Sequence, residues 1–254
     1  MRDGGRQRVS HVADRERVAL SWSGGKDSAM ALHELRRSDE VDVASLLTIV
    51  AAEYDRVSHH GVRASLLREQ AAAIGLPLRT IAIETQSPSS CDTNLDANVM
   101  REYERLMRDE MLQYKAEGIT NIAFGDIFLQ PLRDYRERKL AEVGMRGLFP
   151  LWQRDTATLA REFVDLGFKA YLSCVDDAKL GASFAGRAFD HQLLADLPPR
   201  VDPCGEHGEY HSFVFDGPIF QRPLAVSVGE VVQRDVRHFA DLVLKNVEQV
   251  TSLH

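Results

Sequence analysis

Residues 23–28, with the sequence SGGKDS, place the strongest constraint on the fold of this chain. The segment follows a short apolar run, Val18 to Trp22, and precedes a helical pattern from Asp27 to Arg37. Two adjacent glycines let the backbone turn tightly and face an anion with its N–H groups. The start of a helix adds partial positive charge. The order strand, loop, helix therefore predicts a phosphate-binding loop at the edge of an open α/β sheet.

The side chains of this loop suit a nucleotide phosphate. Serine hydroxyls donate hydrogen bonds, lysine supplies a cation, and the aspartate can cap the helix or hold Mg²⁺ together with ATP. The segment is not a Walker A loop, since that loop carries Ser or Thr directly after its lysine, where this chain has Asp27. A glycine turn capped by aspartate, without a ligand, is the alternative. We expect ATP to be bound by Ser23, Gly24, Gly25, Lys26, Asp27 and Ser28.

Short apolar runs alternate with helical patterns in the first half of the chain. The runs cover residues 43–51, 78–83 and 119–124, and the helical patterns cover residues 62–74 and 95–117. A continuous apolar run is typical of a strand buried on both faces, and strands that alternate with helices form parallel sheets. The predicted fold class is therefore α/β, an open parallel sheet with helices on both faces.

The second half of the chain is less regular. Helices are expected over residues 156–166, with Asp155 as the N-cap, and over residues 186–197. Residues 236–250 are expected to form a closing helix or a frayed tail. The N-terminus is polar and rich in arginine, which is typical of a disordered tail. We therefore predict three parts: a disordered tail of residues 1–16, an ATP-binding domain of residues 17–146, and a substrate-binding domain of residues 147–254.

The charge and the cysteines restrict the cell compartment and the partners. The net charge is −7 and the pI about 5.7, so the chain is not built to coat nucleic acid by charge. The three cysteines, Cys91, Cys174 and Cys204, form no C-x-x-C pair, which favours a reducing compartment. No apolar run approaches the roughly 20 residues that span a bilayer. These features predict a cytoplasmic protein without membrane or nucleic-acid partners. A homodimer is expected only because it is the commonest oligomer.

Further polar residues follow other predicted strands. Gly125 and Asp126 follow the strand at residues 119–124, and they are therefore expected beside the phosphate loop, binding ATP. Arg133 and Arg136 come next, and arginine suits phosphate or carboxylate, so we expect them to contact substrate. A solvated helix face is the alternative for these arginines. His60 follows the strand at residues 43–51 and is expected near the adenosine half of ATP, or else is an exposed histidine.

Residues 202–212, with the sequence DPCGEHGEYHS, form the densest cluster of reactive side chains. Carboxylates in such a cluster can orient an amine, accept protons or hold Mg²⁺. Cys204, His207 and His211 have a spacing that could bind a transition metal, but three ligands fall short of a structural zinc site. A glycine-rich turn with capping residues is the bland alternative.

Two of these motifs resemble known families. The loop at residues 23–28 is similar to the S-G-G-x-D-S loop of the PP-loop ATP pyrophosphatases, of the adenine nucleotide alpha hydrolase type. Residues 206–212, followed by Asp-Gly-Pro at 216–218, resemble the signature E-x-G-E-[FY]-H-[ST] and D-G-P turn of the diphthine–ammonia ligase family. Residues 125–127 and 202–205 also match, so the resemblance covers about Val18 to Phe220. His207 departs from the pattern, because many members have Asn there.

The resemblance implies a fold and a reaction. The fold is a HUP-type parallel sheet with a smaller C-terminal α+β domain packed against it. ATP, bound with Mg²⁺, is cleaved between its α and β phosphates when a substrate carboxylate is adenylated. Ammonia, free or supplied by a partner, then forms an amide. The carboxylate belongs to a small molecule or to a protein.

The same resemblance assigns roles to residues of this chain. The catalytic residues implied are Lys26, Asp27, Glu206, Glu209 and His211, and Asp27 would hold the Mg²⁺ that accompanies ATP. Tyr103 and Glu104 match the family loosely and are expected to contact substrate together with Arg133 and Arg136. Two other functions stay open: a PP-loop enzyme that modifies RNA, and a sensor that binds nucleotide without turnover.

Overall fold

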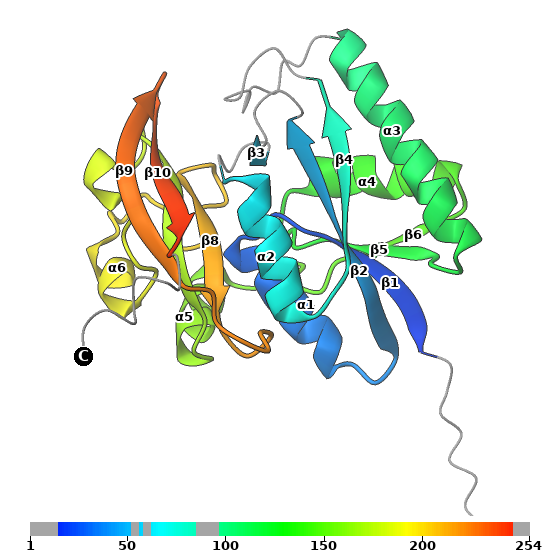
Figure 1. Ribbon diagram of the computed structural model, residues 1–254, viewed down its shortest axis with the longest axis horizontal. Helices are drawn as coiled ribbons and strands as arrows, with labels where there is room; N and C mark the ends of the chain where they lie inside the picture. The colour runs from blue at the N-terminus through cyan, green and yellow to red at the C-terminus, as the bar shows by residue number, and fades with distance from the viewer. Residues whose placement is uncertain (1–14, 52–55, 58–61, 85–96, 246–254) are drawn as a thin grey trace, which may run out of the picture.

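The computed structural model describes residues 15–51, 56–57, 62–84 and 97–245, and its first half is a largely parallel sheet (Figure 1). Five parallel strands lie in the order β4-β2-β1-β5-β6, and the short β3 pairs antiparallel with the end of β2. These strands are β1 (Glu16–Ser21), β2 (Val41–Ala51), β3 (Arg56–Val57), β4 (Leu78–Ile83), β5 (Asn121–Ala123) and β6 (Arg146–Leu148).

Helices cover both faces of this sheet, which confirms the predicted fold class. One face packs on α1 (Lys26–Arg37) and α2 (Ala64–Ile74), and the other packs on α3 (Ala97–Ala116) and α4 (Gln130–Glu142). Strand β1 shows why both faces are apolar. Leu20 belongs to the core under α1 and α2, whereas its neighbour Ala19 belongs to the core under α3 and α4. Alternate side chains of a strand point to opposite faces.

The second half forms an antiparallel sheet in the order β8-β7-β10-β9. Its elements are α5 (Thr156–Asp165), β7 (Lys169–Asp176), the 3₁₀ helix η1 (Ala182–Phe184), α6 (His191–Asp196), β8 (Tyr210–Asp216), β9 (Val226–Arg234) and β10 (Arg237–Leu244). The expected side-chain cap of α5 is present, because the Asp155 carboxylate accepts the N–H of Thr158 at 2.8 Å.

Two sequence-based expectations for this half are wrong. Residues 186–189 are not helical, because Gly186 and Phe189 donate their N–H groups to carbonyls of β7 and Ala188 bridges to Tyr171. Residues 237–244 form β10 instead of a helix, since they pair with both β7 and β9. The secondary structure of both segments depends on pairing with residues far along the chain, and a local sequence pattern does not show such partners.

One apolar core joins the two sheets. It contains Leu20 of β1 and Leu67 of α2 together with Leu172 of β7 and Phe213 of β8, all fully or almost fully buried. In Figure 1, α1 and α2 lie between the strands of the first sheet and β8 of the second. The expected boundary at residues 146–147 falls within β6, which pairs with β5. Most of the expected tail, residues 1–14, lies outside the described residues, and β1 begins at Glu16.

Within the described ranges, none of the helices combines the length and apolar character that a membrane crossing requires.

Candidate active site

The phosphate loop, residues 23–28, follows the carboxyl end of β1 at the point where the strand order reverses. Strands β2 and β4 lie on one side of β1, and strands β5 and β6 lie on the other. Ligands of open α/β sheets bind at this reversal. The loop after β5 comes close, because a Cβ added to Gly125 would stand 2.9 Å from the carbonyl carbon of Asp27 and 3.0 Å from the nitrogen of Ser28. Only glycine permits this approach.

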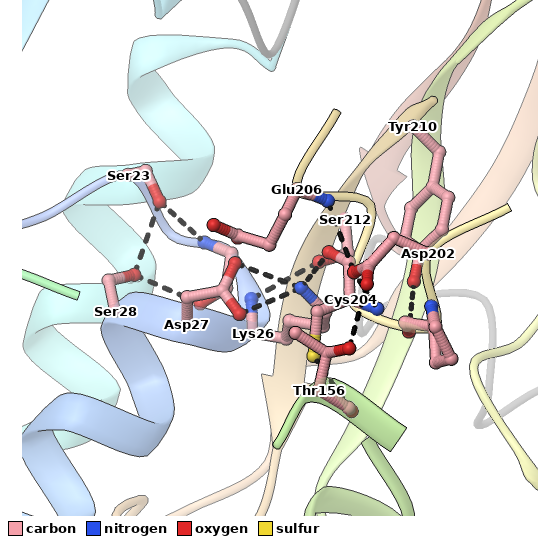
Figure 2. Close-up of polar contacts among 12 residues, drawn as sticks. Ser23, Lys26, Asp27, Ser28, Thr156, Asp202, Cys204, Glu206, Tyr210 and Ser212 are labelled. Atoms are coloured by element: carbon pink, nitrogen blue, oxygen red, sulfur yellow. Dashed lines mark hydrogen bonds and ion pairs between the residues drawn. The ribbon is translucent and has the colours of Figure 1, made fainter. Parts of the chain in front are cut away.

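Hydrogen bonds inside the loop fix its shape (Figure 2). The Ser23 hydroxyl accepts the N–H of Gly25 at 3.2 Å and lies 3.2 Å from the Ser28 hydroxyl, which donates to the Gly25 carbonyl at 2.9 Å. Gly24 has a φ of +78°, and a Cβ there would lie 2.5 Å from a methyl carbon of Leu67. The two serines and the glycines therefore hold a preformed turn at the N-terminus of α1.

Lys26 joins this loop to the segment at residues 202–212. Its side chain is 3% exposed, and its ammonium donates to both carboxylate oxygens of Asp27, at 2.7 and 2.9 Å, and to the carbonyl of Cys204. Its backbone N–H donates to the Ser212 hydroxyl at 3.1 Å. Burial lowers the pKa of Lys26, but Asp27 together with Cys204, Tyr210 and Glu206 more than compensates, and the pKa lies well above its usual value. Lys26 therefore stays charged inside the protein.

Four carboxylates gather at the rim of the loop. Figure 2 shows the Glu206 side chain pointing from the 202–212 segment toward the loop. Burial and then the charge of Asp27 raise the pKa of Glu206 to about 7, with smaller contributions from Asp202 and Asp126. Burial also raises the pKa of Asp126, against the pull of the Arg136 guanidinium. Mutual repulsion of this kind is relieved by a cation.

The oxygen set here fits a hard divalent cation shared with phosphate. One Asp126 oxygen is buried and lies 3.0 Å from a guanidinium nitrogen of Arg136, yet it receives no well-aligned hydrogen bond. Among the described residues, no three His, Cys, Asp or Glu side chains converge closely enough to hold a metal by themselves. A metal at this rim would therefore need phosphate oxygens as additional ligands.

Glu209 shapes the 202–212 segment from inside. Its side chain is 2% exposed, and its two oxygens accept the N–H groups of Asp202, at 3.1 Å, and His207, at 2.9 Å. Asp202 in turn accepts the N–H of Cys204 at 2.8 Å and the hydroxyl of Thr156 at 2.7 Å. Both oxygens of Glu209 are therefore occupied within the segment, whereas Glu206 faces the loop.

The other reactive side chains of this segment contact the second half of the chain. His211 lies on β8 opposite Cys174 of β7. The Cys204 thiol donates to the Thr156 carbonyl at 3.3 Å, and burial raises its pKa to about 12. A thiol with so high a pKa stays neutral, and a neutral thiol is a poor nucleophile.

The residues expected to contact substrate divide into two groups. Arg136 reaches the site through Asp126 and stacks on the ring of Phe124 at 4.1 Å. Glu104 instead accepts the Tyr135 hydroxyl, at 3.1 Å, and the Lys139 ammonium, at 2.9 Å, which joins α3 to α4.

Arg133 stacks on Phe149 and Trp152, both at 4.6 Å, and bonds to Glu137 at 2.8 Å. Tyr103 packs against the core under α3, where burial raises its pKa. His60 lies outside the described residues.

Two family models match almost the whole described chain. Residues 16–147 match the diphthamide synthase N-terminal domain, and residues 155–248 match the diphthamide synthase C-terminal domain. The chain belongs to the diphthamide synthase family. The resemblance drawn from the motifs is thereby confirmed.

Relatives within this family are named diphthine–ammonia ligase. The Homo sapiens protein is 27% identical over 243 residues, which cover 88% of each chain. The Danio rerio protein is 29% identical over 244 residues, or 85% of this chain and 88% of the relative. The Schizosaccharomyces pombe protein is 27% identical over 224 residues, which cover 83% of this chain but 36% of the relative.

Two solved structures share 18% identity with this chain. One is a predicted subunit of a tRNA methyltransferase from Methanocaldococcus jannaschii, with a TM-score of 0.36 over 62% of this chain and 78% of that chain. The other is the U34-tRNA thiolase NcsA from Methanococcus maripaludis, with a TM-score of 0.35 over 60% of this chain and 57% of that chain. Scores this low carry no weight for fold or function.

His207, the departure from the family signature, has a defined place. Its backbone N–H is held by Glu209, and its carbonyl accepts the Lys179 ammonium at 2.5 Å. Its ring meets the ring of Phe128 edge to face, with centroids 5.6 Å apart. Because Phe128 follows Asp126 by two residues and His207 follows Glu206, this contact joins the two acidic segments of the site.

Gln70 is the main site residue that sequence reasoning missed. It lies on the face of α2 that carries Leu66, Leu67 and Ile74, all of which are buried. A glutamine among the apolar positions of a helix was the available signal, because a buried amide requires hydrogen-bond partners. Its partners are in the phosphate loop and in β8.

Proposed function

We propose that this chain is an ATP-dependent, AMP-forming ligase that joins ammonia to a carboxylate. The observation that carries the proposal is the direct bonding between the phosphate loop and the 202–212 segment, through Lys26, Cys204 and Ser212. In support of this reaction, a loop suited to pyrophosphate lies beside Glu206, a carboxyl suited to an amine. The names of the relatives agree with this reaction.

In the first step the loop would hold the β and γ phosphates of ATP. A carboxylate oxygen of the acceptor bonds to the α phosphorus while the bond from that phosphorus to the pyrophosphate oxygen breaks. The N-terminus of α1 and the charge of Lys26 stabilise the departing pyrophosphate, because preorganised donors in a buried site act strongly on developing charge. Mg²⁺, when bound with ATP near Asp27 and Asp126, would neutralise further phosphate charge.

In the second step the ammonia nitrogen bonds to the acyl carbon, and the bond from that carbon to the AMP oxygen breaks. The nitrogen must lose one proton, and Glu206 would accept it. A carboxyl with a pKa of about 7 is well matched to this task at neutral pH. The acceptor is a small molecule or a protein that carries a free carboxylate, and diphthine is the first candidate because the relatives are named for it.

Product analysis tests the proposal. The protein is incubated with MgATP, ammonium and an extract of its host, and AMP with pyrophosphate is separated from ADP with phosphate. We expect AMP and pyrophosphate, lost in Lys26→Ala and strongly reduced in Glu206→Gln. Glu102→Gln, an exposed carboxylate on α3, is the matched control and should keep full turnover. ADP with phosphate contradicts adenylation, and tight ATP binding without turnover favours a sensor.

A further inference from the structure

Gln70 of α2 is completely buried and all of its polar atoms are bonded. Its amide nitrogen donates to the carbonyls of Gly24, at 3.0 Å, and Val214, at 2.5 Å. Its amide oxygen accepts the indole N–H of Trp22 at 2.8 Å. One side chain therefore connects three segments: the end of β1 with the phosphate loop, α2, and strand β8.

These bonds fix the orientation of one peptide group in the loop. The Gly24 carbonyl receives a second hydrogen bond from the N–H of Val214 at 2.9 Å. In a trans peptide the carbonyl of one residue and the N–H of the next point in opposite directions. With the Gly24 carbonyl directed at Gln70 and β8, the Gly25 N–H must face the other way, and it points toward the Ser23 hydroxyl inside the loop.

The bonds also restrict a part of the backbone that would otherwise be flexible. Gly24 has a φ of +78°, which glycine adopts readily, and a Cβ added there would lie 2.5 Å from a methyl carbon of Leu67 and 2.9 Å from the amide oxygen of Gln70, so α2 packs closely against this turn. A loop with two adjacent glycines has a large conformational entropy when it is unrestrained. Such a loop binds an anion weakly if the ordering must take place at the moment of binding.

We propose that Gln70 is a positioning residue for the nucleotide, which holds the 24–25 peptide so that the loop is ordered for phosphate before ATP arrives. The inference rests on the proposed function only for the identity of the ligand. Because the second partner of Gln70 lies on β8, the second sheet is part of the nucleotide site even though it contributes no residue to the loop itself.

The test compares ATP affinity with stability in three variants. Gln70→Met has a similar length and removes all three bonds. Gln70→Glu keeps the acceptor for Trp22 but loses both donors. Ile74→Ala lies one turn further along the same helix, is fully buried, and removes core packing only. The dissociation constant of MgATP is measured by calorimetry, and the melting temperature by circular dichroism, with binding measured where all three variants are folded.

We expect Gln70→Met and Gln70→Glu to weaken ATP binding by at least about tenfold, since each lost hydrogen bond to a fixed carbonyl contributes on the order of 1 kcal/mol. Ile74→Ala should lower the melting temperature at least as much and leave the affinity within about twofold, because its packing loss is remote from the loop. At saturating ATP, AMP formation by the Gln70 variants should recover most of its rate, so that KM changes more than kcat.

Trp22 gives a direct readout of the same contact. The chain has two tryptophans, so a Trp152→Phe background reports Trp22 alone. Its emission should move to shorter wavelength in Gln70→Met, which removes the bond to the indole, and should keep its position in Gln70→Glu.

Wild-type affinity in Gln70→Met, or an affinity loss in all three variants that follows the loss of stability, would overturn the positioning role. Failure of the wild-type protein to bind ATP would instead contradict the proposed function, so the two failures are distinguishable.

Discussion

Replacing Glu206 by Gln should stabilise the nucleotide-free protein at alkaline pH and abolish the dependence of its stability on this carboxyl. Folding raises the pKa of Glu206 from the ordinary value of 4.5 to about 7, because the side chain is buried and faces Asp27. Below pH 4.5 both the folded and the unfolded chain carry the proton. Between pH 4.5 and 7 the unfolded chain releases it while the folded chain keeps it, so stability falls as pH rises and is constant above pH 7.

The magnitude follows from the two pKa values. Their difference is about 2.5 units, and each unit is worth about 1.4 kcal/mol. The folded wild-type protein therefore loses up to about 3 kcal/mol between low and high pH through this group. For a protein of this size, 1 kcal/mol moves the melting temperature by roughly 2–4 °C. The melting temperature of Glu206→Gln, measured relative to wild type, should therefore be roughly 6–12 °C higher at pH 8 than at pH 4.5.

The assay is thermal unfolding followed by circular dichroism at pH 4.5, 6 and 8, with EDTA and without nucleotide. Glu102→Gln is the control, because Glu102 is exposed and bonds to Arg105, which lowers its pKa. The melting temperature of this control, measured relative to wild type, should not rise between pH 4.5 and pH 8. A Glu206→Gln protein whose melting temperature tracks wild type at every pH would refute the assignment of Glu206 to a buried, carboxylate-rich environment.

Three further outcomes are expected. Ser212→Ala removes the acceptor of the buried Lys26 N–H. The variant should lose about 1–3 kcal/mol of stability, measured by denaturant unfolding, and should have a higher KM for ATP, measured from initial rates. An unchanged KM contradicts this role of Ser212. Gly125→Ala places a methyl group 2.9 Å from the Asp27 backbone, so calorimetry should show weaker ATP binding, and equal affinity would argue against the close approach. Asp155→Ala removes the cap of α5. Because its bonds to Thr158 lower the pKa of Asp155, the substitution should lower the melting temperature less at pH 3 than at pH 7, with AMP formation unchanged.

The parallel sheet and its loop could be predicted from the sequence because their signals are local. The apolar runs at β2 and β4 and the glycine pair at the start of α1 are contained within short windows. The same holds for Asp155, whose cap of α5 depends on residues three positions away. The placement of Gly125 beside the loop followed from a rule about strand ends and did not depend on a local pattern.

The rest depends on contacts between distant segments. The strand β10 exists because β7 and β9 flank it, and nothing in residues 237–244 requires it. The roles of Glu209 and Gln70 likewise depend on where their partners lie, since the same carboxylate that resembles a catalytic group accepts two backbone N–H groups. Sequence pattern identified which residues are special, but not which of them face the loop.

The common core of the two sheets has a consequence for how the chain unfolds and for how it can be rearranged. Leu67 of the first half and Phe213 of the second half belong to the same buried core. If one half unfolds, the core side chains of the other half are therefore exposed to water. Unfolding should then be a single cooperative transition. For the same reason the two halves of related chains are poor candidates for exchange in chimaeras, since each half packs its core against side chains of the other. What two family models describe separately is, in energetic terms, one indivisible unit.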